Sequence, residues 1–327
     1  MAARAYSTAL ELVPSDAIAA ANLAKLPAGP VYRKAAAAEV RFLARRAAAV
    51  ALAKLGAKRA GRSLEALGLV RAGDGDADSL ASMMLRTVGY LRLLETGQAP
   101  LPASVAHLSQ GSGGSGSGSG GGGGGLWSLR SAEMPEVLGR LEGGGEAPMT
   151  LAAFAWGGVW YHSLMRAFSH PTVRAALVRA SRLGGSALVL GSSLGFETYF
   201  LALTFGIPSV GVEILSSLVR VSHAVQSEHG VPTSLVSFQC EDALNYRIPS
   251  DTAIVYADDT AWDAPALAAL AAKLSAELPD GAIVVHNSEH GFASQPAFKL
   301  LEVVSVETSW NPSHPVYVHE LVRSKKR

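Results

Sequence analysis

The sequence predicts an α/β protein: a seven-stranded, mostly parallel, doubly wound sheet that ends in a C-terminal antiparallel β-pair and is preceded by an N-terminal helical module. Three observations carry this prediction. From about residue 186 onward, apolar runs of strand length alternate with runs of helical spacing, a pattern typical of parallel strands joined by right-handed crossovers. The last two β-rich runs are separated by a short connection, which favours an antiparallel pair. Upstream of residue 111 the apolar spacing is helical.

The N-terminal part, residues 1–110, is predicted to be the helical module. Residues 33–57 and 78–95 have the apolar spacing of amphipathic helices, with the turn-forming segment RAGDGDAD between them. Residues 111–125 contain only Gly and Ser, so they have no side chains with which to form a core. We expect a flexible linker with a root-mean-square span of about 20 Å, followed by a second domain over residues 126–327.

Charge is distributed unevenly along the chain. Residues 1–72 hold 12 Lys/Arg and 4 Asp/Glu, whereas residues 73–327 hold 16 and 23. A basic start of this kind is typical of an organelle transit segment, but its interspersed acidic residues and helical spacing favour a structural helix. The arginines lie among alanines and are not clustered with aromatics, which argues against a nucleic-acid partner.

Cysteine content and hydropathy bear on the compartment. Cys240 is the only cysteine, which favours a reducing compartment, and we expect it to be a small, buried strand residue. No apolar run approaches the length of a membrane span. We therefore expect a soluble intracellular protein of the cytoplasm, with a plastid or mitochondrion as the alternative. The sequence does not fix the oligomeric state.

Within residues 126–327 the elements follow in a regular order. Residues 150–183 are predicted to form two helices that are interrupted near His170-Pro171, because proline disfavours helix in the residue before it. The expected strands are 187–191, 209–214, 234–240, 252–259 and 281–287, the expected helices 196–206, 216–230 and 264–278, and the closing β-pair 300–310 with 315–322.

The turn after the first strand, in LVLGSSLGFE, is the first candidate ligand site. A dinucleotide fingerprint would require glycines at 191, 193 and 196, whereas the chain has Gly191, Ser193 and Phe196. A phosphate-binding P-loop would require a Lys-Ser/Thr pair, which does not follow Gly195. NAD, FAD and a P-loop nucleotide are therefore disfavoured.

The remaining features of this turn fit a ligand that has a ribose and no pyrophosphate. Gly191 and Gly195 flank Ser192 and Ser193, and Glu213 ends the next strand. A carboxylate at that position can accept hydrogen bonds from both ribose hydroxyls. These residues are predicted to bind the cofactor.

A further acidic position lies in CEDAL, after the third strand. Asp242 can accept a hydrogen bond from an exocyclic adenine amine, and we assign Ala243 to the same cofactor site. S-adenosylmethionine meets all of these conditions.

The segments LVLGSSLGFE, VGVEI and CEDAL together resemble the cofactor half of class I S-adenosylmethionine-dependent methyltransferases, over roughly residues 150–322. The resemblance implies S-adenosyl-L-methionine as cofactor and methyl transfer as activity. The chain departs from that family at Val189, where an acidic residue is usual, and at Ser193, where the middle glycine is usual.

Within that superfamily, YADDTAWD, LPDGAIVVHNSE and TSWNPSHPVYVHEL are similar to segments of the non-SET histone lysine methyltransferases. On this resemblance Asp258, Asp259 and Trp262 would stand at the substrate mouth, and Trp310 and Tyr317 would line the channel for the nucleophile. The chain has two aspartates where that family has two asparagines, and it has no evident basic nucleosome-binding segment beside the catalytic part. Chromatin is therefore disfavoured as the substrate.

Other interpretations of these residues stay open. Asp258 and Asp259 can cap the next helix, although Asp263 is better placed to do so, and Trp310 and Tyr317 can cover the sheet edge. HNSEH matches an inverted zinc-protease motif, but it follows a strand, so we expect no metal site. Its His286 and Asn287 are expected to border the active site.

The sequence thus supports three classes of function. The first is a methyltransferase acting on a protein side chain, such as lysine, or on a small metabolite. The second is a non-catalytic binding or assembly protein with the methyltransferase fold, which Val189 and Ser193 would fit. A nicotinamide-dependent oxidoreductase is disfavoured because it would need glycines at 193 and 196.

Overall fold

The computed structural model describes most of the second half of the chain and a small part of the first. Its described residues are 159, 161–168, 170–292, 294–308 and 311–323, together with 101–109 and five residues between 83 and 94. The helix expected over 33–57 and the Gly/Ser linker over 111–125 lie outside them.

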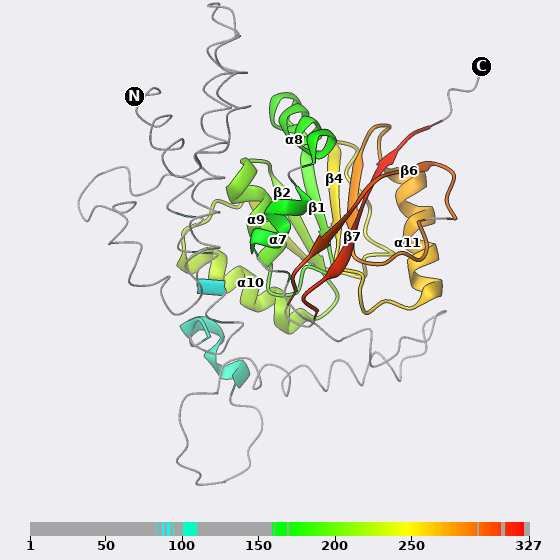
Figure 1. Cartoon of the computed structure of the whole chain (residues 1–327). Coiled ribbons are helices and arrows are strands. Elements are labelled where there is room, and N and C mark those ends of the chain that lie inside the picture. The colour runs from blue at the N-terminus through cyan, green and yellow to red at the C-terminus, as the bar shows by residue number, and fades with distance from the viewer. Residues whose placement is uncertain are drawn as a thin grey trace, which may run out of the picture.

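A seven-stranded sheet forms the centre of the described part (Figure 1), with the strand order β3-β2-β1-β4-β5-β7-β6. Neighbouring strands from β3 to β5 pair in parallel, whereas β7 is antiparallel to both β5 and β6. The predicted parallel sheet and its closing antiparallel pair are confirmed. The strands are β1 (Ser186–Leu190), β2 (Ser209–Glu213), β3 (Val236–Cys240), β4 (Thr252–Ala257), β5 (Ile283–His286), β6 (Phe298–Val306) and β7 (His314–Leu321).

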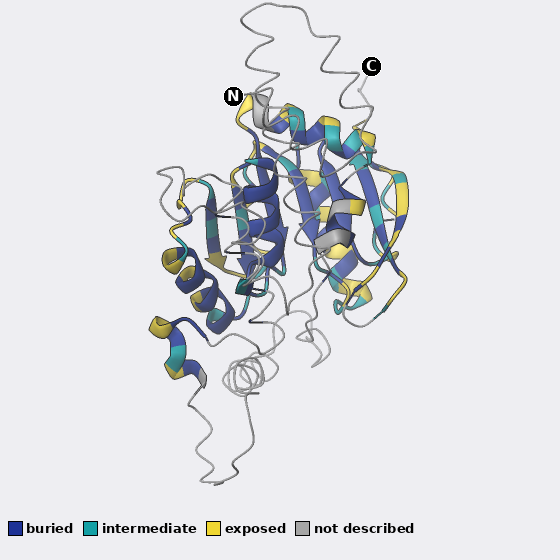
Figure 2. Ribbon diagram, turned by 60° about the vertical axis from the view of Figure 1, so that its left-hand side comes forward, coloured by how far each residue is buried: buried dark blue, intermediate teal, exposed yellow. Residues whose placement is uncertain are grey.

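Helices cover both faces of this sheet, as expected for a doubly wound fold. Alternate residues of the strands point to opposite faces: Val189 belongs to the larger hydrophobic cluster, and Leu188 belongs to the one that includes the inner residues of α11. Figure 2 shows the central strands and the helix surfaces against them as buried. The helices are α7 (Tyr161–Ala167), α8 (Pro171–Leu183), α9 (Phe196–Phe205), α10 (Ser216–Glu228) and α11 (Ala264–Glu277), with a 3-10 helix η1 (Ala103–Ser109).

Local sequence signals account for where two of these helices begin. The break near His170-Pro171 separates α7 from α8, and the His170 ring accepts a hydrogen bond from the Thr172 backbone N–H at 3.3 Å. At the start of α11, Asp263 accepts one from the Ala266 N–H at 2.9 Å. The prediction that Asp263 is the cap of this helix is confirmed.

The described residues of the N-terminal part join the main core. Met83, Thr87, Leu91 and Leu94 are helical, buried and spaced three or four residues apart, so they share one helix face. The Tyr90 ring lies 4.9 Å from the ring of His229, which caps the end of α10. At these positions the predicted helix over 78–95 is confirmed, and it packs toward α10.

The strands β1, β4 and β5 end earlier than predicted, and this decides where the residues that follow them lie. β1 ends at Leu190, β4 at Ala257 and β5 at His286. Gly191, Asp258 and Asn287 are therefore the first residues beyond their strands. They begin the loops at one edge of the sheet, because parallel strands share the direction of their carboxyl ends.

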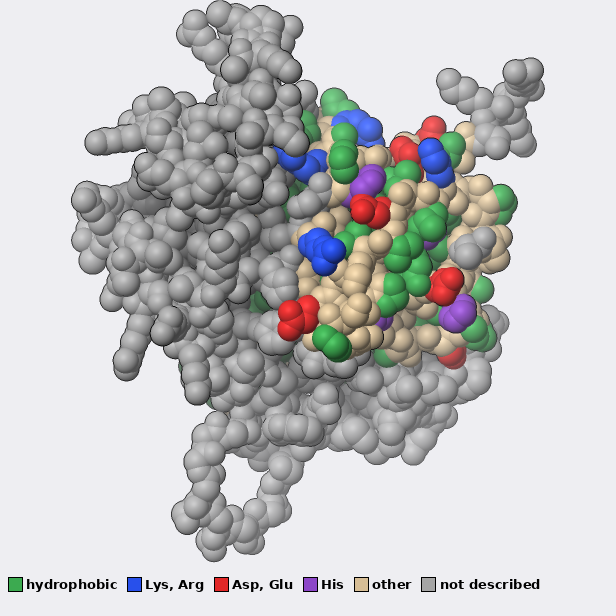
Figure 3. Space-filling view, viewed as in Figure 1, with side chains coloured by type: hydrophobic (Ala, Val, Ile, Leu, Met, Phe, Trp, Pro, Cys, Tyr) green, Lys and Arg blue, Asp and Glu red, His purple; other side chains and the backbone are tan. Residues whose placement is uncertain are grey.

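The outer strand β6 leaves apolar side chains at the surface. Leu300 is 50% exposed and Val303 is 48% exposed. Figure 3 shows hydrophobic side chains gathered on the visible face over β6 and β7. Among the described residues, no helix has both the length and the apolar character needed to cross a membrane.

Candidate functional site

The turn between β1 and α9 adopts a conformation that ordinary residues rarely take. Gly191, Ser193 and Gly195 have positive φ values of 72°, 48° and 87°, and Ser193 is the one non-glycine with positive φ in the described part of the chain. A side chain at position 191 would bring its Cβ to 3.1 Å from the Asp258 carbonyl oxygen. The turn therefore lies close against the end of β4.

Backbone hydrogen bonds fix the shape of this turn from within. The N–H groups of Gly191 and Ser192 both donate to the Val212 carbonyl, at 2.9 and 3.0 Å, and the Gly195 N–H donates to Ser192 at 2.7 Å. Ser192 is buried beneath the turn. These donors are already satisfied, so the turn does not present them to a phosphate group in the way a P-loop does.

Glu213, the last residue of β2, ties the turn to the neighbouring strand. Its Oε2 accepts from the Ser193 N–H at 2.9 Å, and its Oε1 accepts from the Leu215 N–H at 3.0 Å. The side chain is 8% exposed. A carboxylate has about four acceptor positions, and these two bonds orient it.

Asp242 and Ala243 follow β3, the strand that pairs with β2. The Glu241 N–H donates to the Glu213 carbonyl at 3.0 Å, which holds the ends of β2 and β3 together. Asp242 is half-buried, and its Oδ1 accepts from the Leu244 N–H at 2.8 Å. Ala243 is buried in the hydrophobic cluster on the α11 side. The structure thus brings the predicted cofactor residues of β1, β2 and β3 to one edge.

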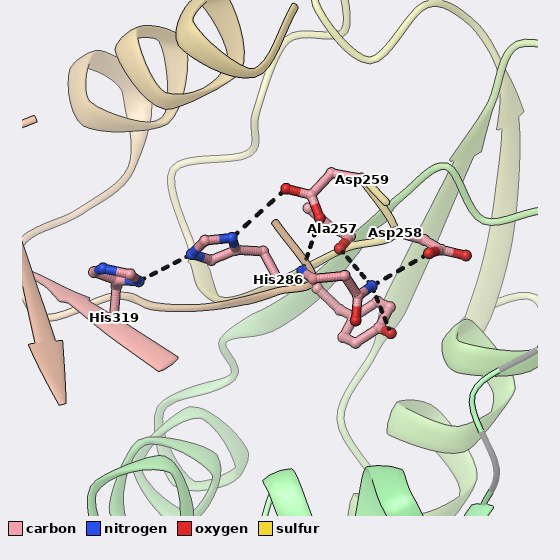
Figure 4. A network of polar contacts seen from close by, with 7 residues as sticks. Ala257, Asp258, Asp259, His286 and His319 are labelled. Carbon is pink, nitrogen blue, oxygen red and sulfur yellow. Dashed lines mark hydrogen bonds and ion pairs between the residues drawn. The ribbon is translucent and has the colours of Figure 1, made fainter. Parts of the chain in front are cut away.

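The two aspartates after β4 separate. The Asp258 N–H donates to the Leu190 carbonyl at 2.9 Å, beside the β1 turn, and its half-buried side chain accepts from the Asn287 amide Nδ2 at 3.2 Å. Asp259 has no exposed surface, and its Oδ1 accepts from the Asn287 backbone N–H at 2.7 Å. Figure 4 shows the two carboxylates pointing apart. The sequence prediction placed both at the substrate mouth; in the structure Asp258 is half-buried and Asp259 is fully buried.

The aromatic residues of the predicted mouth are only partly described. Trp262 is half-buried against the α11-side cluster, and its backbone N–H donates to the Asp259 backbone carbonyl at 3.1 Å. The Tyr317 ring lies 5.6 Å from the His286 ring, and burial, with Glu289 adding to it, raises the pKa of the Tyr317 phenol. Trp310 lies outside the described residues.

A polar network that the sequence analysis named only in part connects the ends of β4 and β5 to β7 (Figure 4). His286 Nδ1 lies 3.6 Å from Asp259 Oδ2, and His286 Nε2 lies 2.9 Å from His319 Nδ1. Burial, followed by the neighbouring His286, lowers the pKa of His319 to about 4. His319 was not among the predicted site residues, because only the register of β5 against β7 brings the two imidazoles together.

The structure also shows where the HNSEH segment and Cys240 lie. His286 ends β5 and His290 is exposed in the turn after it, so HNSEH does not lie on a helix. Within the described residues, no three His, Cys, Asp or Glu side chains are grouped as a metal site. The prediction that Cys240 is buried is wrong. Cys240 is the last residue of β3, and the last two residues of this strand are exposed.

Comparisons with known proteins found likenesses of structure only. No family model and no curated protein matches the sequence. The similar solved structures include an RNA methyltransferase from Salinibacter ruber in complex with S-adenosyl-L-homocysteine, at 23% identity over 47% of this chain and 95% of that one, with a TM-score of 0.36. They also include magnesium protoporphyrin IX methyltransferase from Synechocystis PCC 6803, with bound SAM, at 14% identity over 58% and 91%, with a TM-score of 0.38. An O-methyltransferase from Bacillus cereus in complex with SAH has 13% identity over 47% and 82%, with a TM-score of 0.35.

Proposed function

We propose that the chain is an S-adenosylmethionine-dependent methyltransferase that binds its cofactor across the ends of β1, β2 and β3. The observation that carries this proposal is the position of Glu213. Its carboxylate is oriented by the Ser193 and Leu215 N–H groups, at the edge of the sheet where doubly wound folds bind their ligands. No assignment is taken from the likenesses of structure, so the proposal rests on the residues of this chain.

The residues of the site fit the chemical groups of this cofactor. Glu213 would accept from the two ribose hydroxyls, and Asp242 from the adenine amine. Ser193 takes the left-handed conformation that a glycine usually supplies in this turn, with φ of 48°, so the departure from the family pattern at that position leaves the shape of the turn in place. The satisfied backbone donors of the turn favour a ligand without a pyrophosphate.

The acidic character of the edge suits a positively charged ligand. Glu213, Asp242 and Asp258 lie there. When bound, the cofactor would supply an electrophilic methyl group on a sulfonium. The chain would contribute chiefly position, because an in-line displacement depends on the alignment of the two reacting atoms.

The acceptor would bind beside Asp258, and Trp262 and Tyr317 would line the same site, as the resemblance to the lysine methyltransferases implies. A neutral amine or hydroxyl can donate a hydrogen bond to the Asp258 carboxylate, whereas a carboxylate acceptor would be repelled by it. We therefore propose a protein side chain such as lysine, or a small metabolite with an amine or hydroxyl, as the methyl acceptor. The finer resemblance to histone lysine methyltransferases supports the first of these.

Methyl transfer from tritiated S-adenosylmethionine tests this proposal. The purified full-length protein is incubated with acceptors of three kinds: a lysine-rich peptide mixture, small amines and phenols, and short RNA as the anionic counterpart. We expect label in the peptide or small-molecule arm and none in RNA, and we expect Asp258→Asn to lower the rate. Transfer to RNA alone would overturn the acceptor assignment. No transfer in any arm would favour a non-catalytic protein of the same fold.

A further inference from the structure

A row of buried polar side chains extends from the end of β4 through β5 to β7 (Figure 4). It runs from Asp259, after β4, through His286 at the end of β5 to His319 in β7. Asp259 and His286 have no exposed surface, and His319 is 5% exposed. The Phe292 ring stacks on His286 at 4.0 Å between ring centroids, so an aromatic side chain packs directly against this row of polar side chains.

The donor and acceptor groups of these side chains indicate which imidazole nitrogens carry a hydrogen. His286 Nδ1 and Asp259 Oδ2 are 3.6 Å apart, beyond hydrogen-bond distance, and the contact between them is attractive when Nδ1 carries a hydrogen, because a carboxylate only accepts. In a neutral imidazole the other nitrogen is then an acceptor, and the 2.9 Å contact requires His319 Nδ1 to donate to His286 Nε2. His319 thus fixes the tautomer of His286, and His286 presents its N–H to Asp259.

The charge of Asp259 explains why such an arrangement is needed. A buried carboxylate is costly unless hydrogen-bond donors surround it, and the Asn287 N–H at 2.7 Å is its one close donor among the described residues. His286 Nδ1 faces its second oxygen at 3.6 Å. His314, from β7, also lies in the field of Asp259, although burial keeps the pKa of that imidazole below its ordinary value.

Asn287 links the buried Asp259 to Asp258. Its backbone N–H is held by Asp259, and its side-chain Nδ2 lies 3.2 Å from Asp258 Oδ1 and 3.3 Å from the Ala257 carbonyl. The same Nδ2 lies 3.2 Å from the hydroxyl of the fully buried Tyr256. A shift of Asp259 would therefore move Asn287, and with it the donor that orients the Asp258 carboxylate.

We propose that His286, with its tautomer fixed by His319, is a positioning residue that acts through Asp259 and Asn287 to set the orientation of Asp258 at the acceptor site. This inference rests on the proposed function, since it gives Asp258 its acceptor. His286 does not itself touch the reacting atoms. Its contribution is an N–H that faces the buried carboxylate at 3.6 Å and attracts it electrostatically.

Two substitutions at His286 separate positioning from packing. In His286→Asn the amide nitrogen can replace Nδ1 and still present an N–H to Asp259, whereas in His286→Gln the amide reaches the position of Nε2, toward His319, and leaves Asp259 without this N–H. We expect nuclear magnetic resonance of the nitrogen-15-labelled full-length protein to show the Nδ1–H tautomer for both His286 and His319. The Asn287 backbone and side-chain amide signals should stay close to wild type in His286→Asn and move in His286→Gln.

Equal shifts of the Asn287 signals in the two variants would show a packing role and overturn the proposal, as would the opposite tautomer of His286. Phe292→Leu is the matched control, because it alters the stacking on His286 and leaves the row of polar side chains intact. With an acceptor found in the tritium assay, His286→Gln should transfer methyl groups at least about tenfold more slowly than His286→Asn, at an unchanged affinity for S-adenosylmethionine.

The two proposals fail in different ways. Absence of transfer by the wild-type protein to every acceptor overturns the proposed function and, with it, the role of His286 in positioning. Transfer by the wild type that is equally fast in both His286 variants overturns the positioning role alone. The resonance spectra establish in either case whether the two imidazoles have the tautomers stated above.

Discussion

The backbone N–H of Ser193 donates to the Glu213 carboxylate at 2.9 Å, so the turn after β1 and the end of β2 hold each other in place. The same carboxylate accepts from the Leu215 N–H, which stands at the start of α10. One side chain therefore orders three elements of the candidate cofactor site. Its structural and binding roles can be measured separately.

Replacement of Glu213 by alanine should lower stability. The substitution removes the acceptor for the Ser193 and Leu215 N–H groups, and an unsatisfied buried donor costs about 1–3 kcal/mol. We expect a loss of about 2 kcal/mol in the free energy of unfolding, measured by urea titration. Glu241→Gln, at an exposed carboxylate on the same edge, should change it by less than about 0.5 kcal/mol. Equal losses in the two variants would contradict the structural role of Glu213.

The conformation of Ser193 predicts the effect of two substitutions there. A left-handed conformation costs a non-glycine residue roughly 1–2 kcal/mol, and a β-branched residue tolerates it least. We expect Ser193→Gly to be as stable as the wild type or more stable by up to about 1 kcal/mol, and Ser193→Val to be less stable by more than that amount. Thermal unfolding followed by circular dichroism measures both, and a stabilising valine would contradict the φ of 48°.

The cap of α11 gives a prediction that does not involve the site. Asp263 accepts from the Ala266 N–H at 2.9 Å, and removal of such a cap typically costs about 1 kcal/mol. Asp263→Ala should lower the free energy of unfolding by this amount, and Asp263→Ser should retain most of it, because a hydroxyl can also accept. If alanine and serine have the same effect, the hydrogen bond does not contribute to stability.

Acid should destabilise the protein through His319. The pKa of this imidazole is near 6.5 in the unfolded chain and about 4 in the folded one, so between these values the unfolded chain binds a proton that the folded chain does not. Stability that is complete above about pH 6.5 is therefore lost as the pH falls toward 4. At 1.36 kcal/mol for each pKa unit, the loss is at most about 3 kcal/mol.

His319→Asn is the variant that tests this pH dependence. Its amide can still donate to His286, but it does not titrate. Urea titrations from pH 7.5 to 4.5 should show a flatter loss of stability in the variant than in the wild type. His314, whose pKa is also lowered, chiefly by burial, should leave a smaller slope in the same direction. Identical slopes in the two proteins would contradict a buried, neutral His319.

The sequence was sufficient to predict the sheet and most elements of its edge. Alternation of apolar strands with helices, and the short connection before the last strand, predicted seven strands with the closing pair, as observed. Gly191, Gly195 and Glu213 were found from their spacing, because a strand, a tight turn and the end of the next strand must meet in a doubly wound fold. Contacts between neighbouring parallel strands are thus predictable from order alone.

Contacts that depend on side-chain direction were not predictable in the same way. Asp258 and Asp259 are adjacent in sequence, but the Asp258 side chain is half-buried whereas the Asp259 side chain is fully buried. His286 and His319 come together only through the register of β5 on β7, in which His286 pairs with Tyr317. A shift of one residue in that register would place His319 on the opposite face, and the sequence does not fix the register.

Isothermal titration of S-adenosylmethionine into the full-length protein, beside Glu213→Ala and the control Glu241→Gln, tests the central claim most directly. The account predicts micromolar binding, about −8 kcal/mol, that is retained in Glu241→Gln. In Glu213→Ala it should weaken by about 100-fold or more, because two hydrogen bonds to a carboxylate are lost at roughly 1.5–3 kcal/mol each. No heat of binding to the folded wild-type protein, or equal affinity in Glu213→Ala, would contradict the proposed cofactor site.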